Sequence, residues 1–150
     1  MFPDEEIRGM YDRIKLPKRG TKYSAGYDFF SPFDFTLTPR QIIKIPTGIR
    51  VCIKEGWFLF CVPRSGLGFK YALTLSNTCG IIDSDFYYAK NEGHIFIKLV
   101  NRSTDNKTLH VKEGEGFVQG IFLPFGITED DDADGERIGG FGSTDKINKK

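Results

Sequence analysis

Two aspartates, Asp83 and Asp85, stand two residues apart in NTCGIIDSDFYY (77–88), between an aliphatic run and a cluster of aromatic residues. Aspartates at such a place can end a strand, because their side chains accept hydrogen bonds from nearby backbone amides in turns. One of them can instead be a general base at the edge of a pocket formed by the flanking residues. Both interpretations remain open from these residues alone.

Two other segments combine basic, hydroxyl and glycine residues in a way that suits an anion. VPRSGLG (62–68) places an arginine, a serine and free backbone amides where a strand would lead into a short helix, and such a turn favours phosphate. RIGGFGSTD (137–145) could fold over a phosphate chain with Phe141 stacked on a base, although it lacks the Gly-Lys-Ser/Thr of a P-loop. An ordinary helix turn capped by Ser65 and a disordered glycine-rich end remain the alternatives.

The side chain of Asn77 and the spacing of the histidines and cysteines indicate which ligands the chain could bind. Asn77 precedes Asp83 by six residues, and its side chain could recognise the donor–acceptor edge of a pyrimidine. The two histidines, His94 and His110, form no metal-ligand spacing with the three cysteines, so we expect no zinc held by the protein. A hard cation such as Mg²⁺, carried on a phosphate chain, fits this set. Together these residues predict nucleotide phosphate chemistry.

Short β-strands are the elements expected to position these residues. The chain has 17 glycines, 7 prolines and 14 phenylalanines, a composition that favours short strands and tight turns over long helices. Strands are predicted within 33–39, 41–53, 57–63, 79–82, 94–101, 107–111 and 116–125. Only SGLGFKYAL (65–73) between them suits a helical turn. We therefore expect an all-β sandwich, jelly roll or barrel with its chemistry on the connections.

The whole chain is expected to form one domain with extensions at both ends. Residues 1–128 would form the β domain, with 1–13 as a polar N-terminal extension. The acidic run EDDDADGE (129–136) predicts a flexible tether that leads to a glycine-rich C-terminal arm, so that 129–150 lies outside the domain.

Composition excludes several classes of partner. The net charge of +1 gives no overall attraction for nucleic acid or for an acidic membrane. No apolar run approaches the ~18 residues of a membrane span, and the N-terminus does not resemble a signal peptide. The three cysteines, Cys52, Cys61 and Cys79, form no C-x-x-C pair. We interpret them as reduced thiols, and hence expect a cytoplasmic location.

Taken in order, five segments resemble the motifs of the trimeric dUTPase family. These segments are PKRGTKYSAGYDFFSP (17–32), PRSGLG (63–68), NTCGIIDSDF (77–86), EGEGFVQGIF (113–122) and RIGGFGST (137–144). The resemblance implies a distorted, β-barrel-like jelly roll that forms a homotrimer with a swapped C-terminal arm, each site being built from all three chains. It also implies the hydrolysis of dUTP to dUMP and pyrophosphate, which keeps uracil out of DNA and supplies dUMP, with Mg²⁺ carried on the triphosphate and held directly by no side chain.

The resemblance assigns roles to residues of this sequence. Asp83 would be the catalytic base that activates water for attack on the α-phosphorus, while Asp28 and Asp85 would support the site. Asn77 and the backbone of residues 80–82 would form the uracil slot. The implied substrate-binding residues are Arg64, Ser65, Gly66, Asn77, Gly80, Ile81, Ile82, Phe86, Phe96, Gln119, Arg137, Phe141, Gly142, Ser143 and Thr144. Arg137 would reach the γ-phosphate from another chain, and Phe141 would cover the uracil.

The sequence departs from the family pattern at several positions. Phe86 replaces the usual tyrosine beneath the deoxyribose, and YYAKNE (87–92) is interpreted as an insertion in a β-hairpin. Gly116 stands where the fourth motif usually has arginine or lysine. The fifth motif has one residue fewer after Arg137 and ends in Asp145, where glycine is usual.

Two alternative functions follow from the same residues. One is a dCTP deaminase or bifunctional relative on the same fold, because a fold alone does not fix a reaction. The other is a nucleotide-switched interaction protein that binds a protein partner through the 87–92 insertion.

Overall fold

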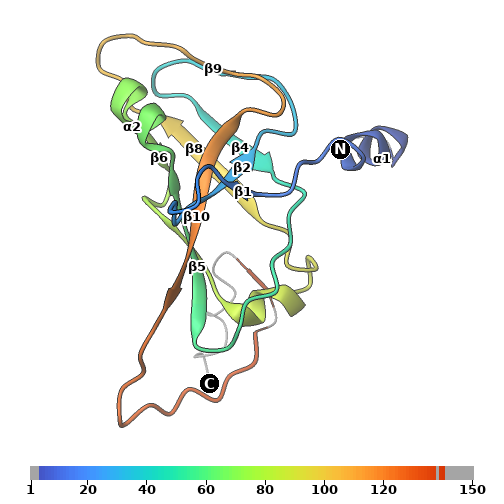
Figure 1. Cartoon of the computed structure of the whole chain (residues 1–150), viewed down its shortest axis with the longest axis vertical. Coiled ribbons are helices and arrows are strands. Elements are labelled where there is room, and N and C mark those ends of the chain that lie inside the picture. The colour runs from blue at the N-terminus through green and yellow to red at the C-terminus, as the bar shows by residue number, and fades with distance from the viewer. Residues whose placement is uncertain (1–3, 138, 141–150) are drawn as a thin grey trace.

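The computed structural model describes residues 4–137, 139 and 140, and most of its regular elements are short β-strands (Figure 1). The elements are α1 (Asp4–Tyr11), β1 (Lys18–Arg19), β2 (Tyr27–Phe30), β3 (Phe35–Leu37), β4 (Ile42–Pro46), β5 (Trp57–Pro63), α2 (Ser65–Tyr71), β6 (Leu73–Leu75), β7 (Gly80–Ile82), the 3₁₀ helix η1 (Ser84–Tyr88), β8 (Phe96–Asn101), β9 (Leu109–Val111) and β10 (Gly116–Pro124). The predicted all-β class is confirmed.

The described strands form three antiparallel sheets. A five-stranded sheet has the order β1-β2-β10-β5-β7, a three-stranded sheet has the order β4-β8-β6, and β3 pairs with β9. In β8, Ile97 and Leu99 are buried while Lys98 between them is exposed, the alternation expected when one face of a strand covers a core. Leu59 and Cys61 of β5 enter the same core.

Several predicted elements match the structure, and the deviations have local causes. β5 coincides with the predicted strand at 57–63, and α2 confirms the helical turn after Arg64. The strand predicted over 41–53 ends at Pro46, because the chain turns at Gly48, whose φ of +69° lies in the left-handed region. The N-terminal extension contains α1, a helix that the polar composition of 1–13 did not predict.

The predicted β-hairpin around the 87–92 insertion is wrong. β7 belongs to the five-stranded sheet and β8 to the three-stranded sheet, so the two strands do not pair. The chain between them forms η1 and then a series of turns in which Glu92 and Gly93 have positive φ. The intervening residues therefore cross from one sheet to the other.

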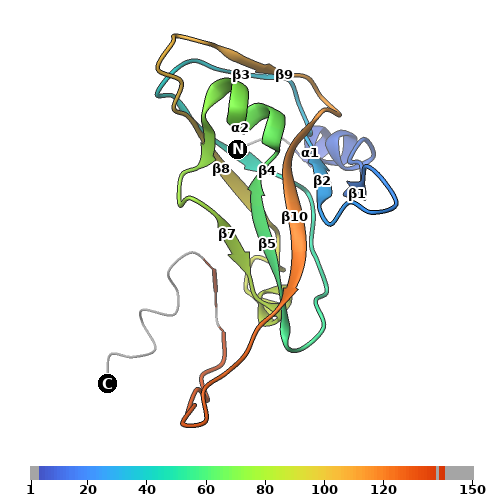
Figure 2. The same ribbon diagram turned by 60° about the vertical axis from the view of Figure 1, so that its left-hand side comes forward.

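The chain beyond β10 leaves the sheets and returns to η1. Residues 125–137 form neither helix nor strand, and 125–136 are exposed. In Figures 1 and 2 this red segment leaves the end of β10, turns, and comes back beside the yellow-green η1. No helix in the described part of the chain is long and apolar enough to cross a membrane.

Candidate active site

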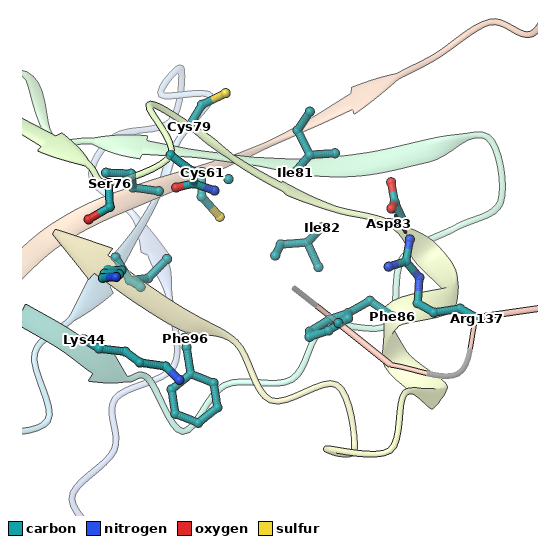
Figure 3. A pocket seen from close by; sticks show the side chains of 16 residues that line it. Lys44, Cys61, Ser76, Cys79, Ile81, Ile82, Asp83, Phe86, Phe96 and Arg137 are labelled. Carbon is teal, nitrogen blue, oxygen red and sulfur yellow. Dashed lines mark hydrogen bonds and ion pairs between the residues drawn. The ribbon is translucent and has the colours of Figure 1, made fainter. Parts of the chain in front are cut away.

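One cavity, called the main cavity here because it collects most of the predicted site residues that the structure describes, lies where the turn after β6, β7 and η1 meet β8. It has a volume of about 670 Å³ (Figure 3). Its lining includes predicted site residues from all of these segments, together with the first residues of the arm. The predicted residues that line it are Asn77, Gly80, Ile81, Ile82, Asp83, Phe86, Phe96 and Arg137. The residues expected to hold the base, the sugar and the water are thus brought together.

The end of the cavity where the uracil slot is predicted is formed by the tight connection between β6 and β7. Thr78 has a φ of +72°, and the Cys79 N–H donates to the Asn77 carbonyl at 2.8 Å. Gly80 then pairs with Cys61 of β5, and a Cβ at Gly80 would lie 3.1 Å from the Cys61 Cβ. Glycine therefore lets β7 approach β5 closely, which presents the backbone of 80–82 to the cavity.

Asp83 stands at the junction of β7 and η1. Its carbonyl accepts a 3.2 Å hydrogen bond from the Phe86 N–H, but its side chain does not cap η1. That carboxylate instead accepts a hydrogen bond from Arg137 Nη2, while Arg137 Nε donates to Asp85 Oδ1 at 2.6 Å. The Arg137 side chain is 16% exposed, so the ion pairs are partly shielded from water. Figure 3 shows Arg137 and Asp83 at one end of the cavity.

The beginning of the arm also covers the aromatic floor. Phe86 is buried, and a Cβ placed on Gly140 would lie 2.5 Å from its Cε2 atom. Glycine at this position lets the backbone of the arm lie directly on the phenyl ring. The arm of this chain therefore contacts both Asp83 and Phe86 of its own chain.

The predicted phosphate-binding residues other than Arg137 gather at a different place. Arg64 and Ser65 line a shallower cavity of about 380 Å³ at the start of α2, where Gly66 also lies. Arg64 Nε pairs with Asp28 Oδ1 at 3.1 Å, and its Nη1 donates to the Gly116 carbonyl at 3.2 Å. Figures 1 and 2 place α2 and η1 at opposite ends of β5. The two sets of predicted residues are not joined into one cavity within a single chain.

Gln119 belongs to the second set and is also engaged with its own chain. Its Nε2 donates to the Pro63 carbonyl at 3.2 Å. Its Oε1 lies so close to Gly26 that a Cβ there would be 2.2 Å away. The glycine of the first motif therefore provides the space in which the Gln119 side chain lies.

The family model for dUTPase matches residues 12–144. The chain belongs to the dUTPase family. It is 40% identical over 134 residues to the deoxyuridine 5'-triphosphate nucleotidohydrolase of Lactococcus lactis subsp. lactis, covering 87% of this chain and 88% of that protein. It is 38% identical over 138 residues to the protein of the same name from Desulfitobacterium hafniense, covering 87% of each.

Solved dUTPase structures have the same fold. The crystal structure of dUTPase from Streptococcus mutans superposes with a TM-score of 0.67 at 37% identity, covering 79% of this chain and 91% of that one. The dUTPase from phage phi11 of S. aureus, described with a species-specific insert, gives a TM-score of 0.65 at 24% identity, covering 83% and 92%. The predicted jelly-roll-like fold of the family is thereby confirmed.

Three polar residues of the main cavity lie outside the dUTPase motifs and were missed. Lys44 and Lys98 face each other in register on β4 and β8, and Lys44 Nζ lies 4.5 Å from the centre of the Phe96 ring. Ser76 lines the same cavity, and its buried hydroxyl has no hydrogen-bond partner within the described part of the chain. The strand alternation that makes Lys44 and Lys98 share a face was the only signal available for the two lysines.

Cys61 and Cys79 also line the main cavity and differ in exposure. Burial raises the pKa of the Cys61 thiol to about 12, so it stays protonated at neutral pH. Among the residues that the structure describes, no group of three or more His, Cys, Asp or Glu side chains could hold a metal ion.

The last predicted site residues and the insertion at 87–92 differ in how far the structure describes them. Phe141, Gly142, Ser143, Thr144 and Asp145 lie outside the described residues. The insertion at 87–92 is described: Arg50 stacks on Tyr87 at 3.5 Å from the ring centre and donates to its carbonyl, whereas Tyr88 is 78% exposed. A protein partner for this insertion stays a prediction.

Proposed function

We propose that this chain hydrolyses dUTP to dUMP and pyrophosphate, with Asp83 as the general base. The observation that carries the proposal is the position of Asp83 at the edge of the cavity that also contains Asn77 and the backbone of 80–82. The names of the relatives, deoxyuridine 5'-triphosphate nucleotidohydrolases, support this substrate. In the proposed step, Asp83 accepts a proton from water while the water oxygen bonds to the α-phosphorus. The bond from that phosphorus to the bridging oxygen breaks, and pyrophosphate leaves.

Recognition of the base is assigned to Asn77 and to the backbone of 80–82. Fixed amide and carbonyl groups that match uracil would leave buried groups unpaired against cytosine, which costs far more than a lost contact. A narrow slot would also exclude the extra methyl of thymine. Phe86, buried on the floor of the cavity, would support the deoxyribose, with Phe96 at its side.

Binding of the triphosphate is assigned to Arg64, Ser65, Gly66 and Gln119. These donors would neutralise the charge that develops on the leaving pyrophosphate. Mg²⁺ bound to the triphosphate would supply further charge neutralisation, and the single carboxylates of this region fit a metal that arrives with the substrate rather than one held by a ligand cluster.

Assembly of a complete site is assigned to a homotrimer. Within one chain, Asp83 and Arg64 line different cavities, and α2 lies at the opposite end of β5 from η1. A second copy that places its Arg64 beside this chain's Asp83 would bring the phosphate-binding residues and the general base into one site. A swapped arm from a third copy, carrying Phe141, Gly142, Ser143 and Thr144, would close it. In that assembly the Arg137 beside Asp83 would come from the same third copy, in place of the Arg137 that contacts Asp83 within a single chain.

The contact between Arg137 and Asp83 suggests how substrate and base are linked. Before the substrate binds, Arg137 holds the Asp83 carboxylate in a hydrogen-bonded ion pair. The triphosphate is a stronger competitor for the guanidinium, because it carries more charge and more acceptor oxygens. Substrate binding would then transfer Arg137 from Asp83 to phosphate and free the base for water.

The Asp83→Asn variant tests the catalytic assignment. The substitution keeps the size of the side chain but removes the proton acceptor, so kcat should fall by about 10²–10⁴-fold, with dUTP still bound. Asp85→Asn is the matched control, because it also removes one partner of Arg137 but no base; its kcat should fall by less than about tenfold. Comparable losses of kcat in the two variants would show that Asp83 is not the general base.

A panel of nucleotides separates this activity from that of a deaminase on the same fold. With Mg²⁺, the chain should release pyrophosphate from dUTP and not from dCTP or dTTP, and ammonia should not appear with dCTP. Appreciable hydrolysis of UTP would show that Phe86 does not replace the tyrosine usual in the family. Release of ammonia from dCTP would show that the chain is a deaminase instead.

A further inference from the structure

The Arg64 side chain crosses two neighbouring strands of the five-stranded sheet. Arg64 follows the last residue of β5, and its side chain passes over the start of β10 to reach Asp28 on β2. Two contacts fix its direction: Nε to Asp28 Oδ1 at 3.1 Å, and Nη1 to the Gly116 carbonyl at 3.2 Å. An arginine held at Nε and Nη1 keeps its Nη2 edge in one orientation, because the guanidinium is planar.

The path of this side chain requires glycine at position 116. A Cβ there would lie 2.9 Å from Arg64 Nη1 and 3.3 Å from its Cδ and Cζ atoms. The close atoms belong to a flexible side chain, so a larger residue would displace Arg64 rather than the sheet. The φ of Gly116 is outside the left-handed region, so alanine is compatible with its backbone.

The backbone around Gly116 is also irregular. The pairing of β10 with β2 shifts register between Gly116 and Val118, so that one extra residue stands on β10. Such a bulge disrupts the ladder locally and redirects the groups beside it. The bulge thus begins at the residue whose carbonyl accepts the hydrogen bond from Arg64.

We propose that Gly116 and Asp28 are positioning residues that aim the Arg64 guanidinium at the phosphate chain of the substrate. Gly116 provides the space and one acceptor, Asp28 provides the second acceptor, and neither touches the substrate. The glycine that replaces the basic residue usual in the fourth motif therefore belongs to a local rearrangement in which Arg64 occupies the space over strand β10. This inference rests on the proposed hydrolysis of dUTP and deepens it.

The test compares the full-length wild type with Gly116→Ala, Arg64→Lys and the double variant. Arg64→Lys loses the planar fork and cannot keep both contacts. Gly116→Ala should lower kcat/KM for Mg-dUTP by about tenfold, the scale of one misplaced charge-assisted hydrogen bond. In the Arg64→Lys background the same change should cost less than about twofold, because it acts only through the arginine. Asp28→Asn should show the same dependence on Arg64.

Gly126→Ala is the matched control. Gly126 lies in the exposed segment after β10, and a Cβ there has no atom within 4 Å, so kcat/KM should stay at the wild-type value. The melting temperatures of Gly116→Ala and the wild type should agree, which distinguishes a displaced side chain from a damaged fold.

Two further measurements make the outcome decisive. The affinity for inorganic pyrophosphate with Mg²⁺, measured by calorimetry, should fall in Gly116→Ala while the affinity for uridine stays the same. An unchanged kcat/KM in Gly116→Ala, or an equal loss in the Arg64→Lys background, would overturn the inference. A wild type that does not hydrolyse dUTP would refute the proposed function instead, and the pyrophosphate affinities would still decide the role of Gly116.

Discussion

Asp83 ends a strand through its backbone and lines the main cavity, and its side chain does not cap the helix that follows. Its backbone ends β7 and begins η1, while its side chain is left for Arg137 and the cavity. Asp85, two residues on, lies within η1 and shares the same arginine. The pair is therefore one strand-terminating residue that faces the cavity and one neighbour that binds the same cation. The spacing of the two carboxylates follows from the geometry of this turn.

The three cysteines should differ in reactivity toward a thiol reagent at pH 8. Cys52 is exposed and should react first. Cys61 is buried with a pKa of about 12, so it should react only after unfolding, because the thiolate is the reactive form. Cys79 lines the main cavity, so a non-hydrolysable dUTP analogue should slow its labelling at least about fivefold, as a saturating ligand does for a residue at its site. Mass spectrometry after timed labelling measures all three.

Rapid labelling of Cys61 in the folded protein would contradict the packing of β7 against β5. Labelling of Cys79 that is insensitive to the analogue would contradict the assignment of the main cavity to the base. Cys52 is the internal control, because it does not line that cavity.

At the scale of elements, the connections next to β4 and β8 tie together the ends of two paired strands of the three-stranded sheet. The Gly48 N–H donates to His94 Nε2 at 3.0 Å, which ties the turn after β4 to the segment before β8. This bond requires a neutral imidazole with its proton on Nδ1. Burial, and then the charge of Lys44, lower the pKa of His94, in agreement with an accepting Nε2.

The stability of the fold should fall on acidification through this histidine. Because the pKa of His94 is lower in the folded state, the unfolded chain takes up a proton first as the pH falls below about 6.5. Stability should therefore be constant above that value and decline below it. His94→Gln keeps an acceptor that does not titrate and should flatten the decline between pH 7 and 5 in thermal unfolding. His110→Gln, at an exposed position on β9, is the control and should keep the wild-type dependence.

At the scale of the whole molecule, the predicted site is divided. The residues predicted to bind the uracil and the water lie near η1, whereas Arg64 and Ser65, which are predicted to bind phosphate, lie at α2. These two positions are at opposite ends of β5 in the same chain. A jelly-roll-like domain can place both sets on its surface, but its core separates them. Association of identical chains can join the two ends while burying no unmatched charge, since Arg64 would meet phosphate.

Mixed oligomers test this division directly. Asp83→Asn and Arg64→Ala should each be nearly inactive alone. Co-expressed in equal amounts and assembled at random, they should recover about a quarter of the wild-type activity per site, because a site then takes an intact Asp83 from one chain and an intact Arg64 from another. Native mass spectrometry of the mixture reports the trimer. No recovery in a mixed trimer would mean that both residues of a site come from one chain.

The sequence by itself determined most of the strand positions and the identity of the motifs. The alternation of apolar and polar residues fixes which side of β8 enters the core, and WFLFCVP gives β5 with its full length. Asn77, Asp83 and the residues between them could be named because they are close in the chain and stay close after folding. Local patterns of this kind depend on periodicities that do not change with the fold.

Only the tertiary structure decided which distant residues meet. Arg137 contacts Asp83 from 54 residues away, and Arg64 reaches the Gly116 carbonyl across 52. These contacts depend on strand order, register and a bulge in β10, none of which a motif encodes. The same holds for the two cavities: a core fills the space between the ends of β5, and its packing sets which functional groups a single chain can bring together.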